Sequence, residues 1–162
     1  MLNRILITAF LVLLPYAAVA GPFDDGVAAY DRKDYQRAYE IWRPLAQQGH
    51  ASAQFLLGLV YDAGTGVPED DAEAVNWYRK AAQQGQARAQ YNLGLMYSKG
   101  EGVPKDYSLA YKWVNIAAAS GDQSAAQVRD IYLPELMTPE QIAEGQRLAR
   151  EWFAKHQQQK AK

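Results

Sequence analysis

Cysteine is absent from the 162-residue chain, and histidine occurs only twice. Without cysteine there is no disulfide, no zinc–thiolate site and no cysteine nucleophile. An excess of charge of one sign is also missing, because 17 lysines and arginines stand against 18 aspartates and glutamates. This balance does not favour nucleic acid or an anionic membrane surface as a partner. His50 and His156 are expected in a turn and near the end of the last helix, and we interpret both as inert surface residues.

Long apolar runs are missing except within the first twenty residues. Arg4 precedes the largely apolar run Ile5 to Leu14, and Pro15 and the small-x-small pattern Ala18-Val19-Ala20 follow it. A membrane-spanning helix needs about 20 apolar residues, so this run is too short for the alternative, an uncleaved anchor. We therefore expect a cleavable signal peptide at 1–20, a mature chain that begins at Gly21, and no stable membrane insertion after cleavage. The expected location is the periplasm of a Gram-negative bacterium, or outside the cell.

The chain repeats itself at an offset of 36 residues. Two segments, beginning at Ala51 and Ala87, share identical residues at many positions of this register. The identical pairs include Gly58/Gly94, Tyr61/Tyr97, Gly64/Gly100, Gly66/Gly102, Pro68/Pro104, Asp70/Asp106, Ala74/Ala110, Trp77/Trp113, Ala82/Ala118 and Gly85/Gly121. A fixed period of this length is typical of stacked supersecondary units.

Each unit is predicted to be a pair of helices. The first helices span Ala51 to about Ala63 and Ala87 to about Lys99, and the second helices end before Gly85 and Gly121. Between them, the first glycine of Gly-x-Gly-Val-Pro suits a left-handed helix end, and the proline cannot continue a helix. Asp70 and Asp106 are then placed to cap the second helices. The small residues of the repeat allow close approach of helices, and its tyrosines and tryptophans fill the remaining space.

These residues resemble the Sel-one-like repeat, a 36-residue relative of the tetratricopeptide repeat. The resemblance rests on Ala-x-Ala-Gln-x-x-Leu-Gly-x-x-Tyr-x-x-Gly-x-Gly-Val-Pro, followed by Asp-x-x-x-Ala-x-x-Trp-x-x-x-Ala-Ala-x-x-Gly. It covers Ala51 to Gly121 as two full copies. The resemblance implies an all-α solenoid of helix-turn-helix repeats, wound as a right-handed superhelix, whose concave face recruits other proteins.

Partial copies flank the two full ones. In the first, Tyr30 is aligned with Tyr61, which leaves five residues of the inner loop missing. The repeat array is therefore predicted to span residues 21–133. Beyond it, Thr138-Pro139-Glu140-Gln141 forms a capping box. Residues 134–162 are interpreted as a capping helix, which seals the end of the solenoid, and a polar tail.

No catalytic constellation is evident, and no cofactor or metal is expected. The Gly-x-Gly pairs lack the preceding strand and the third glycine of a dinucleotide-binding loop. Glu69, Asp70, Asp71 and Glu73 lack the alternation of a calcium loop, so helix capping accounts for them better. Members of the family with hydrolase-like activity are cysteine-rich, and this chain shares none of that framework.

A partner-binding groove is predicted along the first helices, because the first helix of each pair lines the concave face in tetratricopeptide-type folds. Apolar residues rimmed by polar ones mark interaction surfaces, and tyrosine and arginine are frequent at their centres. The alternative is that these residues only pack against neighbouring helices. The candidates are Ser52, Phe55, Leu59, Asp62, Arg88, Tyr91, Leu95, Ser98, Ser124, Gln127 and Ile131.

The sequence thus predicts an exported, non-catalytic scaffold that binds a partner protein or peptide. Two other classes stay open. One is a cell-envelope hydrolase or a factor associated with one, which would need a cleft holding an ionisable group of perturbed pKa. The other is a structural subunit that self-associates through the ends of its solenoid.

Overall fold

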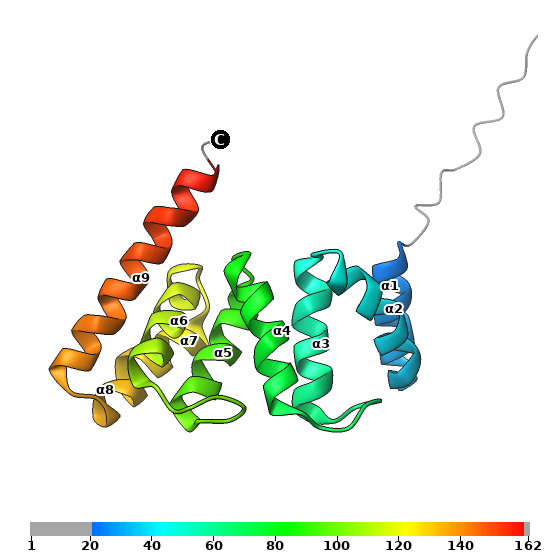
Figure 1. Ribbon diagram of the computed structural model, residues 1–162, viewed down its shortest axis with the longest axis horizontal. Helices are drawn as coiled ribbons and strands as arrows, with labels where there is room; N and C mark the ends of the chain where they lie inside the picture. The colour runs from blue at the N-terminus through cyan, green and yellow to red at the C-terminus, as the bar shows by residue number, and fades with distance from the viewer. Residues whose placement is uncertain (1–20, 161–162) are drawn as a thin grey trace, which may run out of the picture.

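The computed structural model describes residues 21–160, so the expected signal peptide lies outside the described part of the chain. The described residues form a succession of helices joined by short turns and loops (Figure 1). The elements are α1 (Pro22–Asp31), α2 (Tyr35–Gln47), α3 (Ala51–Ala63), α4 (Asp71–Gln83), α5 (Ala87–Lys99), α6 (Tyr107–Ala119), α7 (Gln123–Gln127), the π-helix η1 (Val128–Tyr132), α8 (Leu133–Leu136) and α9 (Pro139–Lys160). The prediction of an all-α solenoid of helix pairs with a C-terminal capping helix is confirmed.

The ends of the helices carry the predicted caps. Gly64 and Gly100 adopt φ of 62° and 82°, the left-handed conformation that ends α3 and α5. The carboxylate of Asp70 accepts a hydrogen bond from the amide of Glu73 at 3.0 Å, and that of Asp106 accepts one from Leu109 at 2.9 Å. An acceptor here satisfies an amide that has no partner within the helix. Local sequence signals therefore fix where each helix begins and ends.

A glycine of each first helix lies against a large side chain of the second helix. A Cβ at Gly26 would overlap the indole of Trp42, and one at Gly58 would overlap the ring of Tyr78. These contacts align Gly26 with Gly58, so Tyr30 takes the place of Asp62 rather than that of Tyr61. The inner loop of the first repeat is therefore four residues shorter than the others, and the predicted deletion of five is wrong by one. Aligning tyrosines misled the prediction, because the contact that recurs is made by the glycine.

The core continues from one helix pair to the next. Trp77 of α4 packs in a cluster with Trp42 and Ala46 of the preceding repeat, and Trp113 of α6 packs in one with Phe55 and Tyr78 of the repeat before it. Each second helix therefore covers apolar surface of the pair before it, which is how a solenoid distributes its core.

Two buried glutamines tie consecutive repeats together. The side-chain amide of Gln54 donates to the carbonyl of Ala46, and that of Gln90 donates to the carbonyl of Ala82, both at 3.0 Å. The carbonyl oxygen of the Gln54 side chain also accepts from Gln84 at 2.7 Å. The same oxygen of Gln90 is buried without a hydrogen-bond partner among the described residues. The reason is that Ser120 occupies the position equivalent to Gln84, and its hydroxyl donates to the carbonyl of Ile116 instead.

Replacing Ser120 with glutamine is therefore expected to stabilise the fold. The new side chain can donate to Gln90 as Gln84 donates to Gln54, and one such bond is worth about 0.5–1.5 kcal/mol. The free energy of unfolding in urea measures the gain. The matched control is Gln84→Ser, which removes the existing donor and should cost a similar amount. A Ser120→Gln variant no more stable than the wild type would show that the two turns differ in geometry.

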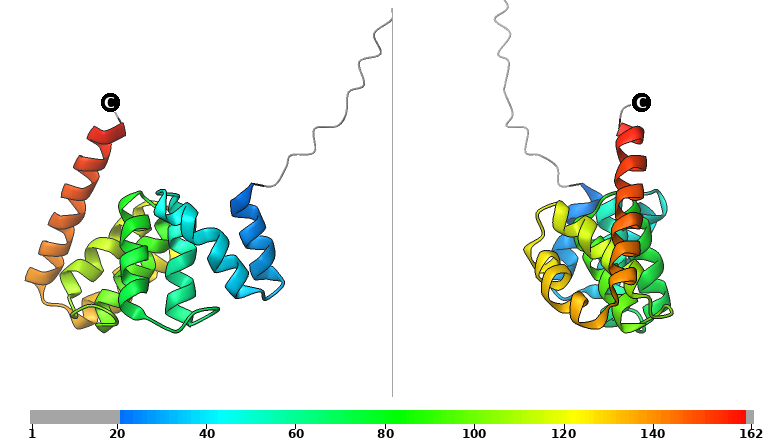
Figure 2. Two further views of the ribbon diagram at one scale, coloured as in Figure 1. Left: turned by 45° about the vertical axis from the view of Figure 1, so that its right-hand side comes forward. Right: turned by 90° about the vertical axis from the view of Figure 1, so that its left-hand side faces the viewer.

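Helix α9 covers the C-terminal end of the array (Figure 2). Its capping box is formed as predicted, because Thr138 and Gln141 exchange hydrogen bonds of 2.9 and 3.3 Å. Gly145 lets α9 approach α6 closely, since a Cβ there would lie 2.8 Å from the Tyr111 side chain. Further along, Trp152 and Phe153 pack against the central core cluster. The helix therefore seals apolar surface that a further repeat would otherwise cover.

Candidate partner-binding surface

The structure distributes the eleven candidates over three first helices, as expected from the repeat. Ser52, Phe55, Leu59 and Asp62 lie on α3, and Arg88, Tyr91, Leu95 and Ser98 lie on α5. Ser124 and Gln127 lie on α7 and Ile131 lies on η1. Their exposure, however, differs strongly from one position to another. The eleven positions therefore do not form one uniformly exposed surface.

Phe55 is a core residue and not part of an exposed floor. It is only 7% exposed, and its ring lies 6.1 Å from that of Tyr78 on the second helix of the same repeat. Phe23 stands in the same relation to Trp42 in the first repeat, with ring centroids 6.5 Å apart. Tyr91, one repeat on from Phe55, is half-buried and packs against the cluster formed mainly by α6. The side chain at this repeat position faces the second helix of its own pair. The prediction that Phe55 lies in an exposed groove is therefore wrong.

Asp62 and Ser98 are engaged in bonds within the fold. The Tyr78 hydroxyl donates to the Asp62 carboxylate at 3.0 Å, which links α3 to α4. Burial raises the pKa of Tyr78, and the Asp62 charge raises it further, so Tyr78 stays protonated as the donor. The Ser98 hydroxyl donates to the carbonyl of Leu95 within its own helix at 2.7 Å. Both side chains therefore have structural roles that the helical period alone does not reveal.

The remaining candidates form the accessible part of the row. Leu59 and Leu95 are half-buried at equivalent positions of α3 and α5, Ser52 is half-buried near the start of α3, and Arg88 is exposed near the start of α5. Ser124 and Gln127 are exposed, and Ile131 is 57% exposed at the position equivalent to Leu95. We call these seven residues the first-helix row.

An apolar patch continues the row where the repeat pattern stops. Tyr132 and Leu136, which follow Ile131 closely in the chain, are 64% and 56% exposed. Tyr132 is equivalent to Met96, which is buried in the core cluster with Trp113 on the second helix of its own repeat. Tyr132 lacks such a cover because the repeat that contains it has no second helix of the repeat pattern. The sequence contained this signal, since the absence of Gly-x-Gly-Val-Pro after Leu133 shows that the array ends here. We call Ile131, Tyr132 and Leu136 the C-terminal apolar patch.

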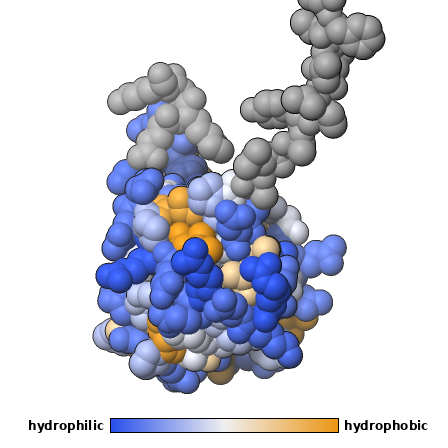
Figure 3. All heavy atoms as spheres, turned by 90° about the vertical axis from the view of Figure 1, so that its right-hand side faces the viewer, coloured by the Kyte–Doolittle hydropathy of each residue, from blue (hydrophilic) through white to orange (hydrophobic). Residues whose placement is uncertain are grey.

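Among residues 21–160, no helix packs on the N-terminal side of the first repeat. A hollow of about 340 Å³ lies between α1 and α2, lined by Pro22, Asp25, Ala28, Ala29, Arg32, Arg37 and Ile41. Ile41 stands at the repeat position of Trp77 and Trp113, which cover the preceding repeat in each case. Figure 3 shows apolar surface surrounded by hydrophilic side chains on this side of the molecule. The residues that the structure describes therefore leave apolar surface of the first repeat uncovered at this end.

Both histidines have structural neighbours. Nδ1 of His50 accepts a hydrogen bond from the amide of Ala53 at 3.2 Å, and its ring stacks on Phe23 at 4.9 Å. This residue caps α3, a role that the interpretation as an inert surface residue missed. His156 stacks on Trp152 at 4.2 Å. Within residues 21–160, no group of three or more His, Asp or Glu side chains could hold a metal ion.

No helix between residues 21 and 160 has the length and apolar composition needed to cross a membrane.

Known proteins share this sequence pattern and this fold. The Sel1 repeat pattern matches residues 25–50, 51–86 and 87–122. A protective antigen present in uropathogenic Escherichia coli strains, which displays an SLR fold, has a TM-score of 0.77 at 30% identity over 82% of this chain and 29% of the antigen. A Sel1 repeat protein from Oxalobacter formigenes has a TM-score of 0.66 at 34% identity, over 79% of this chain and 54% of that protein.

Among curated proteins, the exopolysaccharide production negative regulator of Rhizobium leguminosarum bv. viciae is 37% identical over 62 residues, which make up 36% of this chain and 23% of the regulator. The chain thus spans between 23% and 54% of the lengths of these three proteins. Because the three matched repeats cover more than half of the sequence, the chain belongs to the Sel1 repeat family.

Proposed function

We propose that this protein is an exported, non-catalytic scaffold that holds a partner protein on the first-helix row and the C-terminal apolar patch. Sel1 repeat proteins in general mediate protein–protein interactions. The observation that carries the proposal is the exposure of Ile131, Tyr132 and Leu136 within six residues of one another. Exposed large apolar side chains that cluster in this way are typical of interaction sites. Export rests on the signal-like features of residues 1–20.

The chemistry of the surface supports a protein partner. Tyrosine and arginine are enriched among the residues that dominate binding energy at protein interfaces, and the surface offers Tyr132 and Arg88. Leu95 and Ile131 add apolar area to the first-helix row, while Ser124 and Gln127 offer hydrogen-bonding groups. The curated relative is named for the regulation of polysaccharide production, which also suits a role in binding rather than catalysis.

A crosslinking capture from the native envelope fraction tests the proposal. The bait pair is the wild type and the double variant Leu95→Ser, Ile131→Ser, whose side chains lie outside the three core clusters. The matched control is Asn76→Ser, Lys80→Ser, because both residues are exposed on α4, away from the row. Captured proteins are identified by mass spectrometry and then purified to measure direct binding. We expect the row variant to bind at least about tenfold more weakly, since lost apolar contacts at an interface centre cost about 1–2 kcal/mol each.

Three results would count against the proposal. Equal binding by the wild type and the row variant would move the interface to another surface. If the row variant and the control variant lost binding affinity equally, the substitutions would be acting through a general effect on the fold. If no protein is captured and the mass of the purified chain rises with its concentration, the self-associating subunit becomes the better interpretation, with the open N-terminal hollow as one contact surface.

A further inference from the structure

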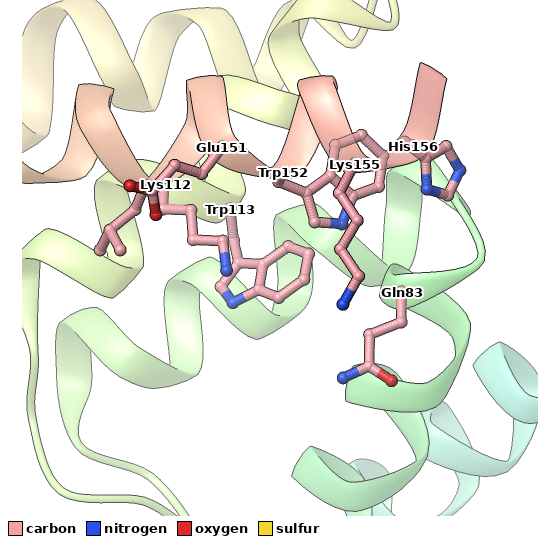
Figure 4. A pocket seen from close by; sticks show the side chains of 8 residues that line it. Gln83, Lys112, Trp113, Glu151, Trp152, Lys155 and His156 are labelled. Atoms are coloured by element: carbon pink, nitrogen blue, oxygen red, sulfur yellow. The ribbon is translucent and has the colours of Figure 1, made fainter. Parts of the chain in front are cut away.

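A second hollow lies where the capping helix leaves the array. Its volume is about 430 Å³, and it opens between α4, α6 and the C-terminal half of α9 (Figure 4). We call it the cap pocket. It is lined by Gln83, Lys112, Trp113, Leu148, Glu151, Trp152, Lys155 and His156. No residue of the first-helix row or of the C-terminal apolar patch contributes to it, so it is a separate site.

The side chains that line the cap pocket include two lysines and one carboxylate, Glu151. Neither Lys112 nor Lys155 forms an ion pair with any residue that the structure describes, whereas Glu151 is paired with Arg147. Lys112 is also withdrawn from water, and this burial lowers the pKa of its ammonium group, an effect that the nearby Glu151 opposes. Removing a charge from water without a direct partner is unfavourable, so an anion placed beside Lys112 would relieve this cost.

The walls of the pocket suit an apolar group attached to that anion. The ammonium of Lys112 lies 4.4 Å from the ring centre of Trp113, which positions it over the aromatic face. The ring centre of Trp152 lies 5.4 Å from that of Phe153, which meets it edge-on, and the His156 ring stacks on Trp152. The indole nitrogen of Trp152 and the amino group of Lys155 face the same open space (Figure 4). Hydrogen-bond donors and aromatic surface therefore converge on one small volume.

We propose that the cap pocket binds the C-terminal carboxylate of a partner polypeptide. Lys112 and Lys155 supply the counter-charges for the carboxylate. Trp113, Leu148 and Trp152 contact the last side chain of the partner. The volume falls within the range of about 300–1,000 Å³ found for small-ligand sites, which suits the end of a chain better than a whole helix. This inference rests on the proposed function, since the partner protein provides the chain end.

The test uses two synthetic probes, acetyl-Ala-Leu-Phe with a free carboxylate and the same peptide with a C-terminal amide. Each is titrated to millimolar concentration into the purified, ¹⁵N-labelled protein at low salt. The chain contains four tryptophans, so the indole N–H region of the NMR spectrum resolves the site. We expect the free acid to shift the Trp113 and Trp152 signals and to leave those of Trp42 and Trp77 in place. The amide should shift none of them.

Charge-removing variants test the role of the lysines. Lys112→Gln and Lys155→Gln should each weaken binding of the free acid by about tenfold, because each removes a charge-assisted contact. The matched control is Lys80→Gln, since Lys80 lies 4.1 Å over the Trp77 ring but outside the pocket. Lys155 is exposed, so its replacement leaves the fold intact even if that of Lys112 does not. The control variant should bind as the wild type does.

Several outcomes would overturn the inference. These are no response to the free acid, an equal response to both peptides, or unchanged affinity in both pocket variants. Sodium acetate or inorganic phosphate that shifted the same indole signals at the same concentration would show a site for small anions rather than for a chain end. The proposed function is tested separately, because the Leu95 and Ile131 variants leave the pocket untouched. A partner lost by those variants, together with a pocket that ignores the peptides, would refute this inference alone.

Discussion

Replacing Trp113 with alanine is expected to lower the free energy of unfolding by about 3–5 kcal/mol, the usual cost of truncating a large aromatic residue in a core. The side chain is only 5% exposed. It belongs to the cluster that joins α3, α4 and α5 to the capping helix, with Phe55, Tyr78 and Ala149 among its members. The substitution thus opens a cavity where the array meets its cap. Urea unfolding followed by circular dichroism at 222 nm measures the loss.

Tyr132→Ala is the control for this prediction. It also removes a large aromatic side chain, but from the exposed C-terminal apolar patch, so stability should change by no more than about 0.5 kcal/mol. If both substitutions cost the same, Trp113 would not be buried in solution, and the packing of α9 against α6 would be wrong. A large loss confined to Trp113→Ala would confirm that the cap is part of the cooperative core.

The parts of the fold that were predictable from the sequence are those encoded by neighbouring residues. Gly64 and Gly100 end their helices because only glycine adopts the required left-handed conformation without strain. Asp70 and Asp106 cap the next helices because their carboxylates reach the amide three residues ahead. Repetition at an offset of 36 then made each local signal appear twice. Helix boundaries and the stacking of pairs followed from these signals.

The candidate surface was predicted less well, because helical periodicity shows that a residue lies on a face but not what that face meets. Phe55 and Leu59 are one turn apart and looked alike, yet Phe55 is buried against Tyr78. Gln54 and Gln90 were assigned no role in the prediction, although both are buried and bond to carbonyls near the ends of the preceding helices. Their recurrence at one repeat position, among small and apolar neighbours, was the available clue. The hydrogen bonds themselves cross a turn and have no local signature.

The cap pocket lay beyond any prediction from the repeat. Its lysines come from α6 and α9, and the register between these helices depends on contacts such as that of Gly145 with Tyr111. No other copy in the chain repeats this contact, so self-comparison of the sequence cannot reveal it. His156 lies close to Gly85 for the same reason, because a Cβ at that glycine would be 3.4 Å from its Nε2. The sequence indicated a capping helix, and only the structure shows what it faces.

Replacing Gly102 with alanine is expected to cost about 3–4 kcal/mol, which is large for the addition of one methyl group. Gly102 has a φ of 64°, and an added Cβ would overlap the carbonyl group of Asp71 and lie 2.8 Å from the amide nitrogen of Ala72. These atoms belong to the backbone at the start of α4, so no side-chain rotation can relieve the overlap. Gly66 makes the same approach to Tyr35 and Gln36 at the start of α2. The inner loop of one repeat therefore packs on the second helix of the repeat before it.

The substitution Gly121→Ala is the control that separates two costs. One is the overlap of the added Cβ with the backbone of α4, and the other is the strain of placing alanine at a positive φ. Gly121 has a φ of 92°, and nothing lies within 4 Å of an added Cβ, so only the conformational cost of about 1–2 kcal/mol should appear. Urea unfolding of both variants gives the difference, which is the contribution of loop packing between repeats. Equal losses would mean that the loop can move away from α4, and that the repeats are joined by their helices alone. A clearly larger loss for Gly102→Ala would explain the second glycine of Gly-x-Gly-Val-Pro, since the first already ends the helix.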